Sequence, residues 1–218
     1  MRWRDKCILA ELGFSSDTWG EVVVVFYSES KVVGLMPLGL KLTENCTLTG
    51  RLYSGSRLYN HITSTKITEL KCKVCVTQDP LLFYTAVFEK SRGAEIFARE
   101  ECPREHCDMC ITGLCRFHSR GEIIDLKIEV EEYVLCRDMP RVFTRATAAI
   151  IEALVWLTKL PHAECKDLSV VLERVEFLVR VVEKSSQRKL YKELAEFIHS
   201  RALELVSEIE SSRCRSRD

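Results

Sequence analysis

The stretch EVVVVFYSESKVVGLMPLGLKL, residues 21–42, decides the fold class. Apart from Glu21, residues 21–27 are β-branched or aromatic, which is typical of a strand buried on both faces. Residues 28–31 are polar and indicate a turn, and residues 32–42 resume as a second strand. That strand contains Pro37, which cannot donate a ladder hydrogen bond, so we expect an edge, a bulge or a break there.

More strands are predicted beyond this pair. Apolar alternation or β-branched content marks residues 46–53, 69–77 and 122–135. Short strands separated by turn signals favour a β-barrel. Residues 81–88 are apolar and ambiguous, and a short helix is expected over 58–64. The charged, cysteine-containing residues 89–121 indicate a long loop or insertion.

The hydrophobic period changes after Asp138. Helices are predicted over about 140–160, 163–183 and 186–211, with Asp138 as a cap of the first and Pro140 in its first turn. We therefore expect two domains, a barrel in residues 1–138 and a C-terminal helical segment in residues 139–218.

Composition narrows the class of protein. The 32 basic and 32 acidic residues cancel, so no global field steers the chain to nucleic acid or an anionic membrane. The N-terminal apolar run is short and broken by Glu11, which fits neither a signal peptide nor a membrane helix, and we expect a cytoplasmic protein. Eleven cysteines, abundant charge and few amide side chains are typical of hyperthermophile proteins, whose intracellular members form disulfides.

The stretch YSGSRLYNHI, residues 53–62, has the composition of an anion-binding turn. Gly55 allows close backbone approach, Ser56 can cap a helix, and Arg57 can hold two phosphate oxygens at once. Free N–H groups at a helix N-terminus add to such a site. A plain strand-to-helix turn with an ordinary cap is the alternative.

Several segments, taken in order, resemble one archaeal family of uncharacterised proteins in the FMN-binding split-barrel superfamily. They are VVVVFY, Gly34 to Gly39 (GLMPLG), Gly55 to Asn60 (GSRLYN), Val74 to Pro80 (VCVTQDP) and Phe143 to Leu154 (FTRATAAIIEAL). The resemblance implies a six-stranded split barrel, bound FMN, a homodimer with flavin near the subunit interface, and flavin reductase-like chemistry.

The resemblance also implies cofactor-binding residues. The flavin phosphate is expected near residues 53–62, through Ser54, Gly55, Ser56, Arg57, Tyr59 and Asn60, with Arg51 as a second cation. The ring and ribityl chain are expected near Met36, Pro37 and Leu38 and near Thr77, Gln78 and Asp79. The alternatives are a β-bulge at Pro37, a solvated Arg51 and a plain turn at Asp79-Pro80.

A cysteine set lies in residues 102–115, outside the family pattern. Cys107-x-x-Cys110 has the short spacing of tetrahedral zinc sites, and we consider Cys102, Cys107, Cys110 and Cys115 as metal ligands. The first three also match an iron–sulfur spacing, while disulfides or thiols are the rival interpretation. Cys72 and Cys75 should point to opposite faces of a strand and not chelate together.

No nucleophile–base pair stands out among the scattered histidines. That fits flavin chemistry, in which the cofactor carries the electrons. We therefore expect an FMN-dependent oxidoreductase or flavin reductase-like electron-transfer protein, with NAD(P)H as a possible donor. The alternatives are a non-catalytic flavin- or metal-binding interaction protein, or a deazaflavin in the same cleft.

Overall fold

The computed structural model describes residues 7–17, 19–99, 102–137 and 144–214. The chain forms two compact units, which we treat separately. The first comprises residues 1–77 and 85–140, and the second comprises residues 78–84 and 141–218. The boundary after residue 140 lies near the predicted one, but the sequence did not indicate that residues 78–84 join the helical unit.

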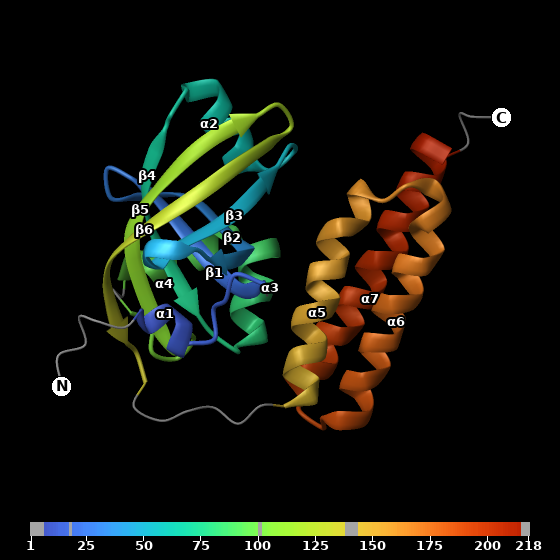
Figure 1. The fold of residues 1–218 in the computed structure, drawn as a ribbon. Coiled ribbons are helices and arrows are strands. Elements are labelled where there is room, and N and C mark those ends of the chain that lie inside the picture. The colour runs from blue at the N-terminus through green and yellow to red at the C-terminus, as the bar shows by residue number, and fades with distance from the viewer. Residues whose placement is uncertain (1–6, 18, 100–101, 138–143, 215–218) are drawn as a thin grey trace. The chain divides into compact units, whose positions relative to one another are not determined.

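The first unit is a closed antiparallel barrel with the strand order β1-β2-β3-β6-β5-β4 (Figure 1). Its strands are β1 (Gly20–Ser28), β2 (Lys31–Leu42), β3 (Thr47–Tyr53), β4 (Glu69–Val76), β5 (Met109–Arg120) and β6 (Ile123–Leu135). Helices α1 (Ile8–Glu11), α2 (Arg57–Thr65), α3 (Pro80–Phe88) and α4 (Lys90–Arg99) lie between or before them. The predicted six-stranded barrel is confirmed.

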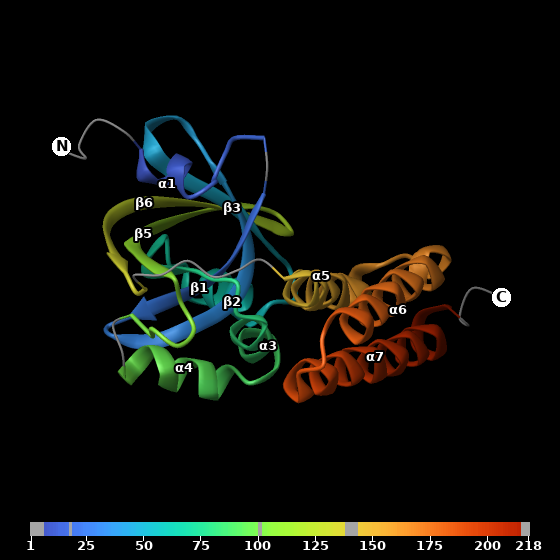
Figure 2. The same cartoon turned by 90° about the horizontal axis from the view of Figure 1, so that it is seen from below.

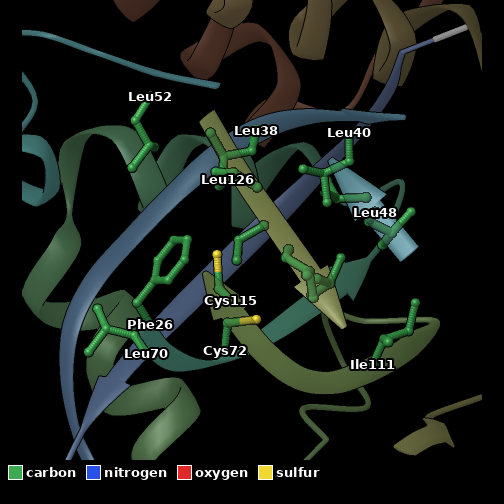
Figure 3. Packing of buried hydrophobic residues seen from close by; sticks show 14 of the residues in the cluster. Phe26, Leu38, Leu40, Leu48, Leu52, Leu70, Cys72, Ile111, Cys115 and Leu126 are labelled. Atoms are coloured by element: carbon green, nitrogen blue, oxygen red, sulfur yellow. The ribbon is translucent and has the colours of Figure 1, made fainter. Parts of the chain in front are cut away.

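Alternate residues of the strands fill the barrel with apolar side chains. Phe26, Leu40 and Leu126 are almost completely buried there, and the thiols of Cys72 and Cys115 lie among them (Figure 3). Removing this apolar surface from water is the main force that closes the sheet. Cys75 is absent from this cluster, which confirms that Cys72 and Cys75 use opposite faces of β4.

The prediction of a long loop over residues 89–121 is wrong, because α4 and β5 occupy most of that range. The cysteines of β5 do not indicate a loop, because Cys is a small residue that is readily buried in a strand. Ile111 and Cys115 face the core of the barrel as ordinary strand residues. Gly113 marks a register shift, and a Cβ placed there would lie 2.3 Å from the carbonyl oxygen of Glu129.

β2 is continuous through Pro37 and has one open edge. It pairs with β1 along its length, but with β3 only at Lys41 and Leu42. Residues 31–40 thus have a single neighbouring strand in the described barrel, and we call their other side the open edge of β2. A proline is tolerated on such an edge. The irregularity in the β1–β2 pairing lies between Phe26 and Tyr27, so no bulge forms at Pro37.

The second unit is a bundle in which α5 (Arg145–Lys159), α6 (Leu168–Ser185) and α7 (Lys189–Ile209) all pack on one another (Figure 2). The three predicted helices are confirmed. α5 begins later than predicted because Thr144 caps it, with its Oγ1 accepting from the Thr147 N–H at 3.2 Å. Asp138 and Pro140 lie outside the described residues. A disulfide joins Cys165 to Cys214 beyond the end of α7.

None of the helices in the described ranges is long and apolar enough to span a lipid bilayer.

Candidate functional site

The turn before α2 has the geometry that the sequence predicts. Gly55 has a φ of 91°, a conformation that glycine adopts without the steric cost of a side chain. Ser56 caps α2, and its Oγ accepts a hydrogen bond from the Tyr59 N–H at 3.1 Å. The N–H groups of the first helical turn have no acceptor within the helix. Those of Arg57 and Leu58 are therefore available to a bound anion.

This turn is fixed to the neighbouring β5–β6 hairpin. The backbone N–H of Ser54 donates to the carbonyl of Glu122 at 2.9 Å. The Tyr59 hydroxyl donates to the carbonyl of Gly121 at 2.6 Å. Ser54 and Tyr59 thus hold the start of α2 in place, which prearranges its N–H groups.

Helices α2 and α4 contact opposite faces of β2 at two consecutive residues. A Cβ at Gly34 would lie 3.1 Å from Leu58 of α2, so that helix packs on the inner face. A Cβ at Gly93 of α4 would lie 2.1 Å from the side chain of Leu35. Leu35 follows Gly34 in β2, so its side chain points to the opposite face of the strand. Both helices therefore pack on the part of β2 that has a single neighbouring strand.

The first residues of these helices form a pair of cations. Arg57 begins α2 and is exposed, and Lys90 begins α4 and is half-buried. Burial and then the positive charge of Arg57 lower the pKa of the Lys90 ammonium group. Like charges that approach each other in this way favour an anion between them. We call Arg57 and Lys90 the cation pair. Nothing in the sequence singles out Lys90, because it belongs to the range predicted as a loop.

A buried histidine nitrogen lies on the same helix. His61 is one turn after Arg57, and its Nε2 is buried without a hydrogen-bond partner among the described residues. Such a group is costly to bury unless a ligand or a water satisfies it. His61 was not among the predicted site residues.

The other residues predicted at the flavin have different surroundings. Met36 packs against the barrel core and Leu38 is buried in it, so both side chains point into the barrel. Pro37 pairs with Val23. Arg51 lies across the sheet from Asp125, 3.6 Å from its carboxylate, on the outer face of β3. Asn60 is exposed on α2.

The segment after β4 is divided between the units. The Thr77 hydroxyl donates to the carbonyl of His106 within the first unit. Gln78 and Asp79 belong to the second unit, where Asp79 Oδ1 accepts from the Leu81 N–H at 3.0 Å at the start of α3. Asp79 therefore acts as a helix-capping residue.

The cysteines of residues 102–115 separate into two groups. Cys107 is bridged to Cys75 and Cys102 to Cys136, and Cys110 lies next to both disulfides. Cys115 lies apart, in the barrel core beside Cys72, where burial and then Cys72 raise the pKa of its thiol. Sequence reasoning missed Cys75 and Cys136; pairing the strands at residues 69–77, 109–120 and 122–135 would have brought them to the same end of the sheet.

This closed six-stranded antiparallel barrel, with helices at the open edge of one strand, defines a split-barrel protein with the flavin reductase-like fold. The model of a family described as "Protein of unknown function (DUF447) N-terminal domain" matches residues 20–137, and the chain belongs to that family. No curated protein matches the sequence.

Solved structures are similar to this chain at low sequence identity. An FMN-bound protein from Methanosarcina mazei, of the same family model, has a TM-score of 0.63 at 16% identity and covers 88% of this chain and 99% of its own. The flavin reductase HpaC, complexed with NADP+, has a TM-score of 0.42 at 14% identity, covering 64% and 90%. A flavin reductase-type protein from Haemophilus somnus has a TM-score of 0.35 at 12% identity, covering 60% and 88%.

Proposed function

We propose that this protein binds FMN at the open edge of β2, with the flavin phosphate between Arg57 and Lys90. The observation that carries the proposal is the turn at Gly55 and Ser56, which begins α2 and leaves the N–H groups of its first turn to an anion, with Arg57 and Lys90 as the neighbouring cations. The FMN-bound protein from Methanosarcina mazei, which has the same fold and family model, supports the choice of ligand.

The chemistry of the turn suits a phosphate dianion. The N–H groups of Arg57 and Leu58 point out of the first turn of α2, and the positive end of the helix dipole adds to their effect. The planar guanidinium of Arg57 can donate two parallel hydrogen bonds to phosphate oxygens, and the Lys90 ammonium adds a compact charge.

The isoalloxazine ring would lie along the open edge of β2. Backbone groups of alternate residues of β2 face this edge, and at Pro37 only the carbonyl is available, since proline has no N–H. A bound flavin supplies two-electron redox chemistry, and the chain supplies position and electrostatics. His61 would offer its unsatisfied Nε2 to the phosphate or the ribityl chain.

We further propose that the bound flavin makes the protein an FMN-dependent oxidoreductase or electron carrier related to flavin reductases. Anaerobic addition of NADH or NADPH to the FMN-loaded protein tests this proposal. Bleaching of the flavin band supports a reductase, whereas retention of the band together with FMN binding supports a non-catalytic flavin-binding protein.

FMN titration of the purified chain, followed by flavin fluorescence, tests the site itself. We expect Arg57→Ala and Lys90→Ala each to weaken binding by about 10- to 100-fold, because a hydrogen bond to a charged group contributes about 1.5–3 kcal/mol. Arg116→Ala is the matched control, because Arg116 is an exposed arginine of β5 that pairs with Glu69 and Glu129. If all three variants bound FMN with equal affinity, the proposed site would be wrong. A deazaflavin phosphate in parallel tests the alternative ring system.

We also propose a homodimer that uses the outer face of α6. Val170 and Phe177 are 45% and 59% exposed and lie two turns apart on one face, beside a surface hollow that Trp156 lines. Exposed apolar side chains grouped on one helix face are candidates for a subunit contact. Light scattering should give a dimer for the native chain and for Leu203→Glu on α7, and a monomer for Phe177→Glu. A native monomer would exclude the dimer.

A further inference from the structure

Five cysteines gather around the end of β4 and the start of β5. Cys75 near the end of β4 lies opposite Cys110 of β5, and Cys110 lies opposite Val134 of β6. Cys107 comes just before β5. Cys102 and Cys136 complete the group, and their sulfur atoms lie 3.8 and 3.7 Å from the carbonyl oxygen of Val134.

The sulfur atoms form two overlapping triads that share Cys110. The Sγ atoms of Cys75, Cys107 and Cys110 all lie within 4.8 Å of one another, and so do those of Cys102, Cys110 and Cys136. The first triad is almost fully buried, at 0%, 0% and 2% exposure. Cys102 is half-buried and is the member nearest to solvent.

This arrangement matches what a zinc ion requires. Structural zinc is held by four thiolates at about 2.3 Å in a tetrahedron, which places the sulfur atoms about 3.8 Å apart. In each triad the sulfur atoms lie within 4.8 Å of one another, so small side-chain rotations would bring them to the spacing that zinc requires. Cys107 and Cys110 also have the two-residue spacing that lets one turn supply two ligands.

We propose that the reduced chain binds one zinc ion through Cys75, Cys107 and Cys110, with a sulfur of either Cys102 or Cys136 as the fourth ligand. The three constant ligands are the fully buried triad. The fourth position has two candidates, because both lie beside Cys110 and are held at the Val134 carbonyl.

The surroundings also suit the charge of such a centre. Four thiolates and one Zn²⁺ carry a net charge of about −2, which must be balanced in a buried place. Lys73 is buried two residues before Cys75 on the same face of β4. Arg137 follows Cys136 and lies 3.6 Å from the carboxylate of Asp108. Lys73 therefore supplies positive charge on the strand that carries Cys75, whereas the charge of Arg137 is paired with Asp108.

The zinc form and the disulfide form exclude each other. Each disulfide must first accept two electrons and two protons from a dithiol reductant, which is itself oxidised to a disulfide. Zinc then displaces one proton from each of the four thiols that it binds. Oxidation reverses the process and releases the ion, so the metal site exists only in the reduced protein.

The test uses the full chain, reduced with a dithiol, freed of reductant without oxygen and loaded with Zn²⁺ or Co²⁺. We expect one metal per chain by elemental analysis, and thiolate-to-cobalt charge-transfer absorption with Co²⁺. Cys110→Ser should lower zinc affinity at least about 100-fold, since residues that merely orient a metal ligand already contribute 10- to 100-fold. Cys115→Ser is the matched control, a buried β5 thiol outside both disulfides, and it should bind zinc like the native chain.

Further variants separate the three constant ligands from the fourth position. Single Cys102→Ser and Cys136→Ser changes should each be tolerated, and the double change should lower affinity as Cys110→Ser does. Circular dichroism checks that each variant is folded; Cys110→Ser retains both disulfides and stays testable in any case. A reduced, folded native chain that binds neither metal, or equal losses in Cys110→Ser and Cys115→Ser, would overturn the proposal.

Discussion

Lys90 at the start of α4 lies within electrostatic reach of Arg57 at the start of α2, and its pKa is lowered by burial and then by the guanidinium charge. The two residues are far apart in the sequence, and their helices α2 and α4 pack on β2 at the consecutive residues Gly34 and Leu35. Two cations within electrostatic reach repel each other, and a bound anion would relieve that repulsion. Together with the capped turn at Ser56, this relationship supports the proposed phosphate site.

Ser56 separates the structural role of the turn from its role in binding. Ser56→Asp should keep the stability of α2, because aspartate caps helices about as well as serine. The same change should weaken FMN binding by at least about tenfold, because it places a negative charge beside the phosphate. Thermal unfolding and FMN titration measure the two effects.

Ser56→Ala should behave differently. It removes the hydrogen bond from the Tyr59 N–H and should lower the free energy of unfolding by about 1 kcal/mol. Parallel losses of stability and affinity in both variants, with no excess binding defect in Ser56→Asp, would contradict a phosphate at this turn.

The lowered pKa of Lys90 predicts a pH dependence of FMN binding. A phosphate favours the charged ammonium, so binding should raise that pKa and take up a proton wherever free Lys90 is partly neutral. Affinity should therefore fall as the pH rises through the lowered pKa of the free protein. Titrations at a series of alkaline pH values measure this fall.

Lys90→Arg is the control for that titration, because arginine keeps its charge throughout the range. The variant should lose the part of the pH dependence that Lys90 causes, while any titration of the flavin itself remains. Identical pH profiles for the two proteins would show that Lys90 does not contact the bound ligand.

Lys90 should also affect stability. Because its folded pKa lies below the unfolded value, the folded state binds fewer protons, and the free energy of unfolding should rise with pH between the two pKa values. Lys90→Met should flatten that rise in urea unfolding experiments on the ligand-free protein. If Lys90→Met leaves the slope of the free energy of unfolding against pH unchanged, other groups cause the pH dependence.

Gly113 tests the account of the barrel. An added Cβ would lie 2.3 Å from the backbone carbonyl of Glu129, so Gly113→Ala should lower the free energy of unfolding by about 2–3 kcal/mol. Gly39→Ala is a control in another strand, where the nearest atom is the flexible Glu21 carboxylate at 3.2 Å. Denaturant unfolding should show the difference. Similar losses of stability in the two variants would argue against the close approach of β5 to β6 at the Gly113 register shift.

Cys115 should be chemically silent in the folded protein. Burial and the adjacent Cys72 raise the pKa of its thiol, and the thiolate is the form that reacts with alkylating agents. We expect mass spectrometry to find Cys115 unmodified by iodoacetamide in the native state and modified after unfolding. Rapid alkylation of the native chain at this residue would contradict its place in the core.

The sequence predicted the parts of the fold that depend on local pattern. The alternation in residues 122–135, the cap at Ser56 and the three C-terminal helices need only neighbouring residues to specify them. It failed where residues distant in the chain decide the outcome. Lys90 and Arg57 meet through β2, and Cys75 and Cys136 join Cys110 through the register of three strands.

The cysteines also contributed to the wrong prediction of a loop over residues 89–121. The charge and the cysteines of this range indicated a loop, although Cys115 serves as an apolar core residue and Cys110 as part of the cluster outside the barrel core. One strand therefore carries cysteines with two unrelated environments. Only the alternation of faces along β5 separates them.

The most direct test of the central claim is an FMN titration of the purified native chain beside the double variant Arg57→Ala/Lys90→Ala. We predict saturable FMN binding that gives a yellow protein after gel filtration, and loss of that binding in a double variant that unfolds at the same temperature. A native chain that stays colourless after reconstitution with FMN, or a double variant that binds FMN as tightly as the native chain, would contradict the claim.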